Sequence, residues 1–164
     1  MANVGVFFGS DGGNSKDVAN KIAAALGATA SDISKSSASD LAAFDNLVLI
    51  TPTYGAGDPQ SDWEDFLGGV DGSEFDGKVV GIVSIGDQEL YSDTFAEGGA
   101  HIYAKVANHA KVVGATSVDG YEFEASAFVD GGKFLGLVLD EDNQSDESDE
   151  RIAAWVEAIK GEFK

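Results

Sequence analysis

The sequence of 164 residues contains no cysteine, and its ten lysine and arginine residues are outnumbered by 29 aspartate and glutamate residues. Without a thiol, the chain cannot form disulfides, thiolate zinc sites, thiolate-bound iron–sulfur clusters or a cysteine nucleophile. The formal net charge of −19 repels nucleic acids and anionic lipids, and it favours encounters with basic protein surfaces. We therefore expect no nucleic-acid partner.

Long apolar runs are missing as well. No stretch approaches the roughly 20 apolar residues that span a bilayer, and the first eight residues lack the basic region and cleavage site of a signal peptide. These observations predict no membrane partner and a cytoplasmic location. The length suits a single domain, residues 1–164, with one sizeable core.

Short apolar runs alternate with segments of helical periodicity. Strands are predicted at residues 4–8, 29–33, 47–50, 78–85 and 135–139. Helices are predicted at residues 15–26, 62–67 and 92–113, at a short turn over 39–44, and in a last segment that begins near residue 148. Ser39 and Ser148 are the predicted amino-terminal caps, and Gly27 is a predicted helix stop.

This alternation is typical of an α/β protein whose parallel sheet is covered by helices on both faces, a three-layer sandwich. A five-stranded doubly wound sheet of order 2-1-3-4-5 fits the chain length. Such sheets bind ligands beyond the carboxyl ends of their strands, so the loops after the first, third and fourth strands are candidate binding loops.

The loop after the first strand reads Ser10-Asp11-Gly12-Gly13-Asn14-Ser15. Two glycines permit close approach to a ligand, and free N–H groups at a helix start favour an anion. A P-loop would need a lysine before Ser15, where Asn14 stands, and the dinucleotide fingerprint G-x-G-x-x-G is not met. The loop on its own is therefore interpreted either as a site for a phosphate held by neutral donors or as an ordinary glycine-rich turn.

Three loops taken together resemble the flavodoxin family. The family's phosphate loop, (Thr/Ser)-x-Thr-Gly-x-Thr, corresponds to residues 10–15, with Gly12 in place of the middle threonine. Thr51-Pro52-Thr53-Tyr54-Gly55-Ala56-Gly57 resembles its Pro-Thr-Trp loop, and Gly86-Asp87-Gln88-Glu89-Leu90-Tyr91 resembles its Gly-Asp-Gln-x-x-Tyr loop. Residues 117–135 would be the insertion in the fifth strand that marks the long-chain branch.

The resemblance implies a flavodoxin-like fold and a low-potential one-electron carrier, not an enzyme, that uses noncovalently bound FMN and cycles mainly between semiquinone and hydroquinone. It implies a monomer whose partners are basic-surfaced redox proteins, such as a ferredoxin/flavodoxin-NADP reductase, a photosystem or nitrogenase reductase. The cofactor-binding residues that it implies are Ser10, Asp11, Gly12, Gly13, Asn14, Ser15, Thr51, Pro52, Thr53, Tyr54, Gly55, Ala56, Gly57, Ile85, Gly86, Asp87, Tyr91 and Asp142.

Individual roles follow from the same resemblance. Tyr54 and Tyr91 would flank the isoalloxazine ring, with Tyr54 replacing the family's usual tryptophan. The Gly55–Ala56 peptide would turn its carbonyl toward flavin N5, and glycine makes that turn easy. Asp87 would contact the pyrimidine side of the ring and Asp142 the ribityl chain, and either carboxylate could instead cap a loop.

Two other functions remain open. An FMN-dependent NAD(P)H/quinone reductase would also bind FMN, and a non-redox binding module could keep the fold without the cofactor. A phospho-accepting receiver domain is excluded, because Gly9-Ser10 and Ile50-Thr51 stand where it needs acidic residues. His101 and His109 are interpreted as surface or packing residues.

Overall fold

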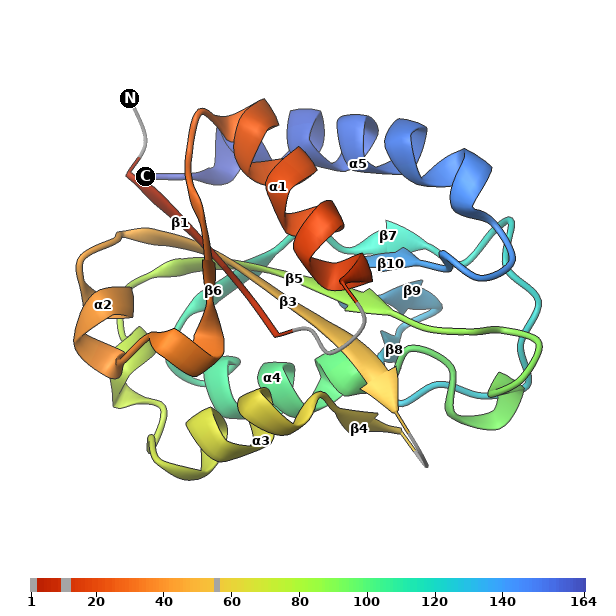
Figure 1. The fold of residues 1–164 in the computed structure, drawn as a ribbon, viewed down its shortest axis with the longest axis horizontal. Helices are drawn as coiled ribbons and strands as arrows, with labels where there is room; N and C mark the ends of the chain where they lie inside the picture. Colours follow the sequence, from red (N-terminus) through yellow and green to blue (C-terminus); the bar gives the residue numbers. More distant parts are fainter. Residues whose placement is uncertain (1–2, 10–12, 55–56) are drawn as a thin grey trace.

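The computed structural model describes residues 3–9, 13–54 and 57–164, and its centre is a parallel sheet (Figure 1). The main path of the sheet contains β1 (Val4–Phe8), β2 (Ala30–Asp32), β3 (Asn46–Tyr54), β5 (Val79–Ile85) and β10 (Leu137–Leu139). They lie in the order β2-β1-β3-β5-β10, which is 2-1-3-4-5 when the predicted strands are numbered along the chain. The α/β expectation is confirmed.

The sheet has seven strands among the described residues rather than the predicted five. The short β4 (Asp58–Pro59) pairs antiparallel with the end of β3. The other added strand, β6 (Lys111–Val113), pairs parallel with the first half of β5, and β10 pairs with its second half. The edge strand is therefore interrupted, and the chain leaves it after Val113 and returns at Leu137.

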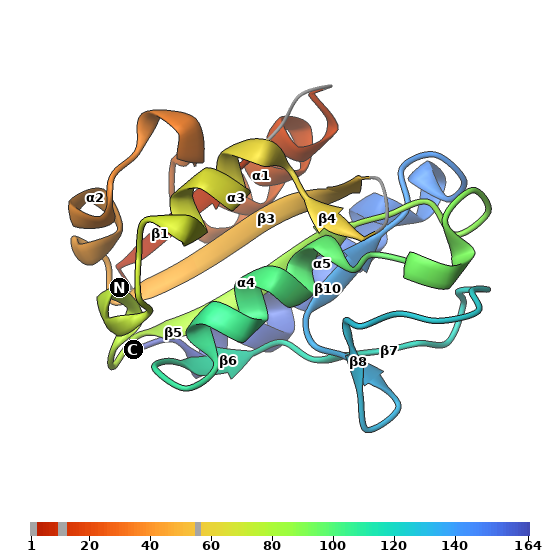
Figure 2. The same ribbon diagram turned by 90° about the horizontal axis from the view of Figure 1, so that it is seen from below.

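The predicted helix over residues 92–113 is wrong, because its last residues form β6. The segment contains η3 (Ser92–Thr94), α4 (Gly98–Val106) and then β6. The insertion that follows forms a small antiparallel sheet of β7 (Thr116–Ser117), β9 (Lys133–Phe134) and β8 (Val129–Asp130). Figure 2 shows these strands beside the edge of the main sheet.

Helices cover both faces of the sheet (Figures 1 and 2). One face carries α1 (Asn14–Leu26) and α5 (Ser145–Ile159), and the other carries α3 (Ser61–Gly68) and α4. The remaining helical segments are short: η1 (Ile33–Lys35), α2 (Ala38–Ala42), η2 (Ser73–Phe75) and η4 (Lys160–Glu162).

The core consists of two clusters, one on each face, because successive side chains of a strand point to opposite sides. In β3, Val48 and Ile50 pack beneath α1 and α5, whereas Leu47 and Leu49 join the cluster beneath α3 and α4. Burial of each such side chain stabilises the fold by about 1.5–3 kcal/mol. All residues of β5 are buried, as expected for a central parallel strand.

Local chemistry decides where the helices begin and end. Gly27 ends α1 in the left-handed region, at φ 67°, as predicted. Ser39 does not cap α2, because Ser37 precedes the helix and its N–H donates to the Asp40 carboxylate at 2.8 Å. Ser148 lies inside α5 rather than at its cap, which is Gln144.

Among the described residues, no helix has both the length and the apolar character needed to cross a membrane.

Candidate functional site

The three motif loops meet at the carboxyl ends of the parallel strands, around a hollow of about 320 Å³ that we call the loop hollow. Its size falls within the range of small-molecule sites. The residues that line it are Asn14, Ser15, Pro52, Thr53, Tyr54, Ile85, Gly86, Asp87, Leu90, Tyr91 and Asp142. Every one of these except Leu90 is among the predicted site residues.

Other predicted residues lie elsewhere. Thr51 is fully buried, and its hydroxyl accepts a hydrogen bond from the Gln60 N–H at 3.1 Å. Gly13 precedes α1 and Gly57 follows β3, and neither lines the loop hollow. The predictions for Ser10, Asp11, Gly12, Gly55 and Ala56 fall outside the described residues.

The start of α1 supplies the polar end of the loop hollow. Ser15 is 1% exposed, and its hydroxyl has no hydrogen-bond partner among the described residues. A buried hydroxyl without a partner is costly, and the first N–H groups of a helix also need acceptors from outside the helix. This end of the hollow therefore suits an anionic group.

Tyr54 and Tyr91 supply the aromatic walls, with 40% and 43% of their surface exposed. Leu90 is 76% exposed beside them. Large apolar side chains seldom stay this open in a cluster unless they contact a ligand or a partner. A flat aromatic ligand would cover the faces of these rings.

Two carboxylates of the loop hollow have opposite pKa shifts. Burial raises the pKa of Asp87, but hydrogen bonds outweigh it and leave the value below the ordinary 3.8. The donors are the Leu90 N–H at 2.9 Å, the Asn143 amide at 2.8 Å and the Glu89 N–H at 3.0 Å. Burial, reinforced by the negative charges of Asp87 and Asp140, raises the pKa of Asp142.

A buried polar bridge fixes the loop that carries Asp87. Asp140 is fully buried, and its carboxylate accepts hydrogen bonds from the Gln88 N–H at 3.1 Å and the Gln88 side-chain amide at 2.7 Å. The side-chain oxygen of Gln88 (Oε1) in turn accepts a hydrogen bond from the Glu122 N–H at 2.7 Å. Gln88 therefore joins the loop after β5, the turn after β10 and the insertion.

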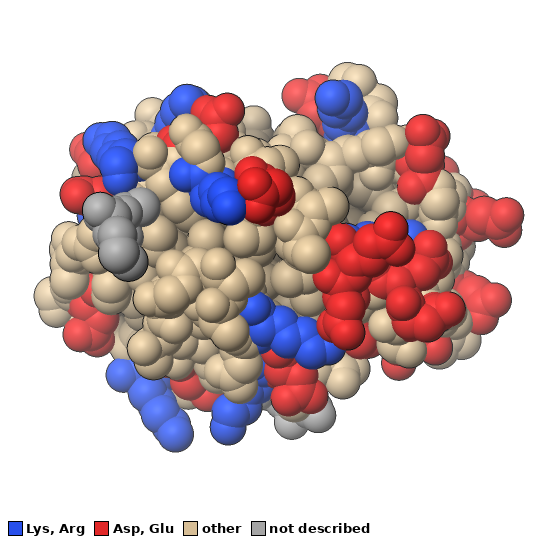
Figure 3. All heavy atoms as spheres, turned by 90° about the horizontal axis from the view of Figure 1, so that it is seen from above, with Lys and Arg blue, Asp and Glu red and all other residues tan. Residues whose placement is uncertain are grey.

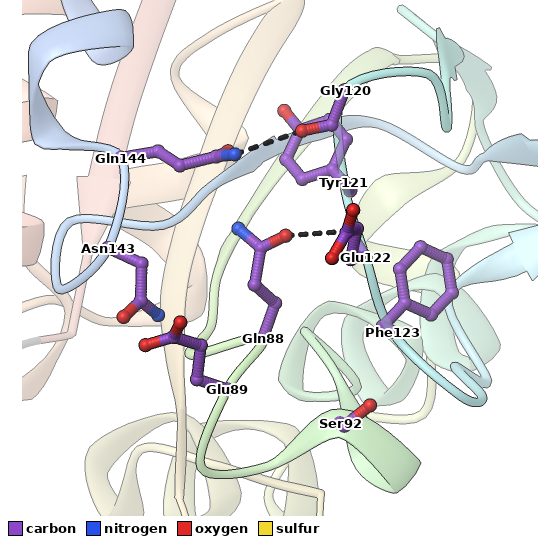
Figure 4. A pocket seen from close by; sticks show the side chains of 9 residues that line it. All are labelled: Gln88, Glu89, Ser92, Gly120, Tyr121, Glu122, Phe123, Asn143 and Gln144. Atoms are coloured by element: carbon purple, nitrogen blue, oxygen red, sulfur yellow. Dashed lines mark hydrogen bonds between the residues drawn. The ribbon is translucent and has the colours of Figure 1, made fainter.

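A second hollow, of about 730 Å³, lies beside Gln88 (Figure 4). Its lining residues are Gln88, Glu89, Ser92, Gly120, Tyr121, Glu122, Phe123, Asn143 and Gln144. None of them is a predicted site residue, and the hollow is open and polar. The smaller loop hollow is the better candidate, because it combines aromatic walls, an unpartnered buried hydroxyl and all three motif loops.

Acidic side chains gather at one end of the face drawn in Figure 3, over the start of α5. Asp146 and Glu147 lie in the first turn of that helix, where the helix dipole favours negative charge. Among the described residues, no group of three or more acidic or histidine side chains is arranged to hold a metal ion. Asp146 and Glu147 are both exposed.

Sequence reasoning missed Leu90, Gln88 and Asp140. Leu90 could have been found from its place inside the third loop motif, directly before Tyr91. The Gln88–Asp140 bridge joins residues 52 positions apart, and no local pattern signals such a contact.

Comparison with known proteins agrees with this geometry. A family model described as flavodoxin matches residues 6–155. The chain is 54% identical to a flavodoxin of Helicobacter pylori over 99% of both chains, and 39% identical to a flavodoxin of Nostoc over 98% of this chain and 96% of that one. A crystal structure of Fusobacterium nucleatum flavodoxin bound to flavin mononucleotide superposes with a TM-score of 0.93, at 34% identity and full coverage of both chains.

These matches run along nearly the whole chain, and the three motif loops surround one hollow at the switch point of the sheet. The chain belongs to the flavodoxin family of FMN-containing electron carriers.

Proposed function

We propose that the loop hollow holds one FMN noncovalently and that the chain carries single electrons at low potential between larger redox proteins. The observation that carries this proposal is the meeting of three separate motif loops around one hollow, with the unpartnered Ser15 hydroxyl at its polar end and two tyrosines in its walls. Bound FMN supplies a flavin ring that accepts and returns electrons one at a time.

The phosphate end depends on neutral donors in this account. Asn14 and Ser15 line the hollow, and no lysine or arginine is among the lining residues that the structure describes. The remaining proposed donors, Ser10 to Gly13, precede them in sequence. A hydrogen bond to a charged group is worth about 1.5–3 kcal/mol, so several such donors suffice for tight binding.

At the ring end, Tyr54 and Tyr91 pack against the flat flavin ring and exclude water. Asp87 faces the pyrimidine side of the ring, and Asp142 faces the ribityl chain. Negative charge near the ring disfavours further reduction. One carboxylate about 10 Å away costs roughly 0.4 kcal/mol in a water-like dielectric before screening. The excess of acidic residues therefore supports a low potential.

The acidic surface supports partners with basic faces, such as a ferredoxin/flavodoxin-NADP reductase, a photosystem or nitrogenase reductase, because opposite charges steer diffusional encounter. We also propose that residues 1–164 form a single domain and that the protein acts as a cytoplasmic monomer. A basic partner would dock where the exposed Leu90 and Tyr91 lie beside the hollow.

Titration of the FMN-free chain with FMN, followed by the quenching of flavin fluorescence, tests the proposal. One FMN should bind per chain, and Ser15→Ala should weaken binding roughly 10- to 100-fold through the lost charged hydrogen bond. Ser39→Ala, at an exposed serine, is the control and should bind normally.

The same preparation separates the alternatives. A chain that takes up no FMN would favour the non-redox module. Bleaching of the FMN-loaded chain by NADPH alone, at enzymatic rates, would favour the reductase.

A further inference from the structure

The first turn of α4 holds the strand ends that border the loop hollow. The Gly98 N–H donates to the Thr53 hydroxyl at 3.0 Å, and the Gly99 N–H donates to the Ser84 hydroxyl at 3.0 Å. The first N–H groups of a helix have no partner within it, so these two hydroxyls of β3 and β5 satisfy them. Thr53, a lining residue of the hollow, is thereby fixed to α4.

Two further side chains of the same helix end face Gly57. His101 Nε2 lies 3.0 Å from the Gly57 carbonyl oxygen. Glu97 precedes His101 by one helical turn, so the two side chains share a face of the helix. A Cβ placed on Gly57 would overlap Glu97, and the φ of 93° at Gly57 also favours glycine.

Glu97 is itself fixed. Its Oε1 lies on the side of Gly57, and its Oε2 accepts a hydrogen bond from the Ala127 N–H of the insertion at 2.7 Å. The contact between His101 and Gly57 requires a proton on Nε2 of the imidazole ring. A carbonyl oxygen only accepts, so Nε2 must donate, which the imidazolium and one neutral tautomer both do.

We propose that His101 is a positioning residue that clamps the carboxyl end of the loop from Thr53 to Gly57, while the Gly98 N–H clamps its amino end. This inference rests on the proposed function, since the loop contributes Thr53 and Tyr54 to the cofactor hollow. Both clamps come from α4. Thr53 and Gly57 are therefore already placed before FMN binds, and less conformational entropy is lost on binding.

Two readouts on the full chain test the clamp. In the FMN-free protein, amide hydrogen exchange at Tyr54, Gly57 and Asp58 should become about two- to tenfold faster in His101→Ala, in line with the loss of one hydrogen bond. His101→Gln, whose side-chain amide can donate to the same carbonyl, should restore the slower exchange.

In the FMN-loaded protein, His101→Ala should release FMN about two- to tenfold faster, and His101→Gln should again restore the rate. The matched control is His109→Ala, which removes the chain's other histidine, paired with Asp76 at 2.6 Å away from the loop. It should change neither readout.

Unchanged exchange in His101→Ala, or equal acceleration in His109→Ala, would overturn the clamp. Failure of the wild-type chain to bind FMN would instead refute the proposed function, and the exchange experiment would still decide whether His101 holds the loop.

Discussion

Tyr54 and Tyr91 keep about two-fifths of their surface exposed although both line the loop hollow. Aromatic contacts add about 0.5–1.5 kcal/mol beyond the apolar area that they bury. Tyr91→Ala should therefore weaken FMN binding by about tenfold or more, whereas Tyr91→Phe, which keeps the ring, should bind nearly as well as wild type. Fluorescence titration measures both, and equal affinities for all three proteins would remove Tyr91 from the site.

Asp87 and Asp142 should affect the pH dependence of stability in opposite directions. The lowered pKa of Asp87 means that its ionised form stabilises the fold above its unfolded pKa of about 3.9, and this contribution is lost as the pH falls through the folded pKa. The raised pKa of Asp142 means that stability falls as the pH rises through that value.

At pH 7, Asp87→Asn should therefore lower the free energy of unfolding, and Asp142→Asn should raise it slightly. Asp87 is half-buried and Asp142 is exposed, so solvent screening keeps each effect below about 1 kcal/mol. Urea unfolding at pH 7 and at pH 3 measures the difference, which should shrink at the lower pH. If both variants changed the free energy of unfolding in the same direction, the opposite pKa shifts given to Asp87 and Asp142 would be contradicted.

At the scale of the element, the bridge between Gln88 and Asp140 holds the loop after β5 against the turn after β10. Asp140→Asn replaces one acceptor oxygen by an NH₂ group, and at the Oδ2 position that group faces the side-chain amide donors of Gln88 and Asn143. We expect a loss of roughly 2–3 kcal/mol in the free energy of unfolding, because a buried polar group left unsatisfied costs about 1–3 kcal/mol.

Asp130→Asn, at an exposed position in β8, is the matched control and should stay within about 0.5 kcal/mol of wild type. Denaturant unfolding of the FMN-free proteins at pH 7 compares the two variants. If the two losses were equal, the bridge would have no special role in holding the loop.

The insertion contributes buried side chains to the hydrophobic core. Phe134 in β9 is fully buried, with its ring centroid 5.1 Å from that of Tyr121 and 6.1 Å from that of Phe95. Phe134→Ala should lower the free energy of unfolding by about 3–5 kcal/mol. Its exposed neighbour is the control, and Lys133→Ala should change stability by about 0.5 kcal/mol or less. A small loss for Phe134→Ala would mean that the insertion packs loosely.

The elements that sequence predicted best are those whose own residues determine them. The runs at 4–8 and 47–50 are continuous and apolar because both faces of a central parallel strand are buried. The three-residue β6 escaped prediction, since only four residues separate Lys111–Val113 from the end of α4 and only its pairing with β5 makes it a strand. The predicted cap at Ser148 was wrong, because Ser148 is a buried residue inside α5 and its own sequence neighbours do not show this.

For the site, the family resemblance identified ten of the eleven described residues that line the loop hollow. Eight of the ten lie in the three motif loops, because each motif follows a strand whose carboxyl end reaches the same edge. The contacts that hold these loops were not predictable. Gln88 with Asp140, and His101 with Gly57, join segments 52 and 44 residues apart, and only the fold brings them together.

At the scale of the whole molecule, the net charge of −19 opposes compact folding through self-repulsion. Raising NaCl from about 0.1 M to about 1 M shortens the Debye length from about 10 Å to about 3 Å. The free energy of unfolding of the FMN-free chain should therefore increase, and its melting temperature should rise by about 2–4 °C for each added kcal/mol. KCl at equal ionic strength should act alike, and an unchanged melting temperature would mean that the charges are already compensated.

If this chain holds FMN in the loop hollow and passes electrons singly, spectroelectrochemical titration of the FMN-loaded protein should show two separated one-electron steps. The second step should lie at clearly lower potential, because negative charge and tyrosine packing oppose it. A single two-electron step with no separation would contradict single-electron transfer at this site.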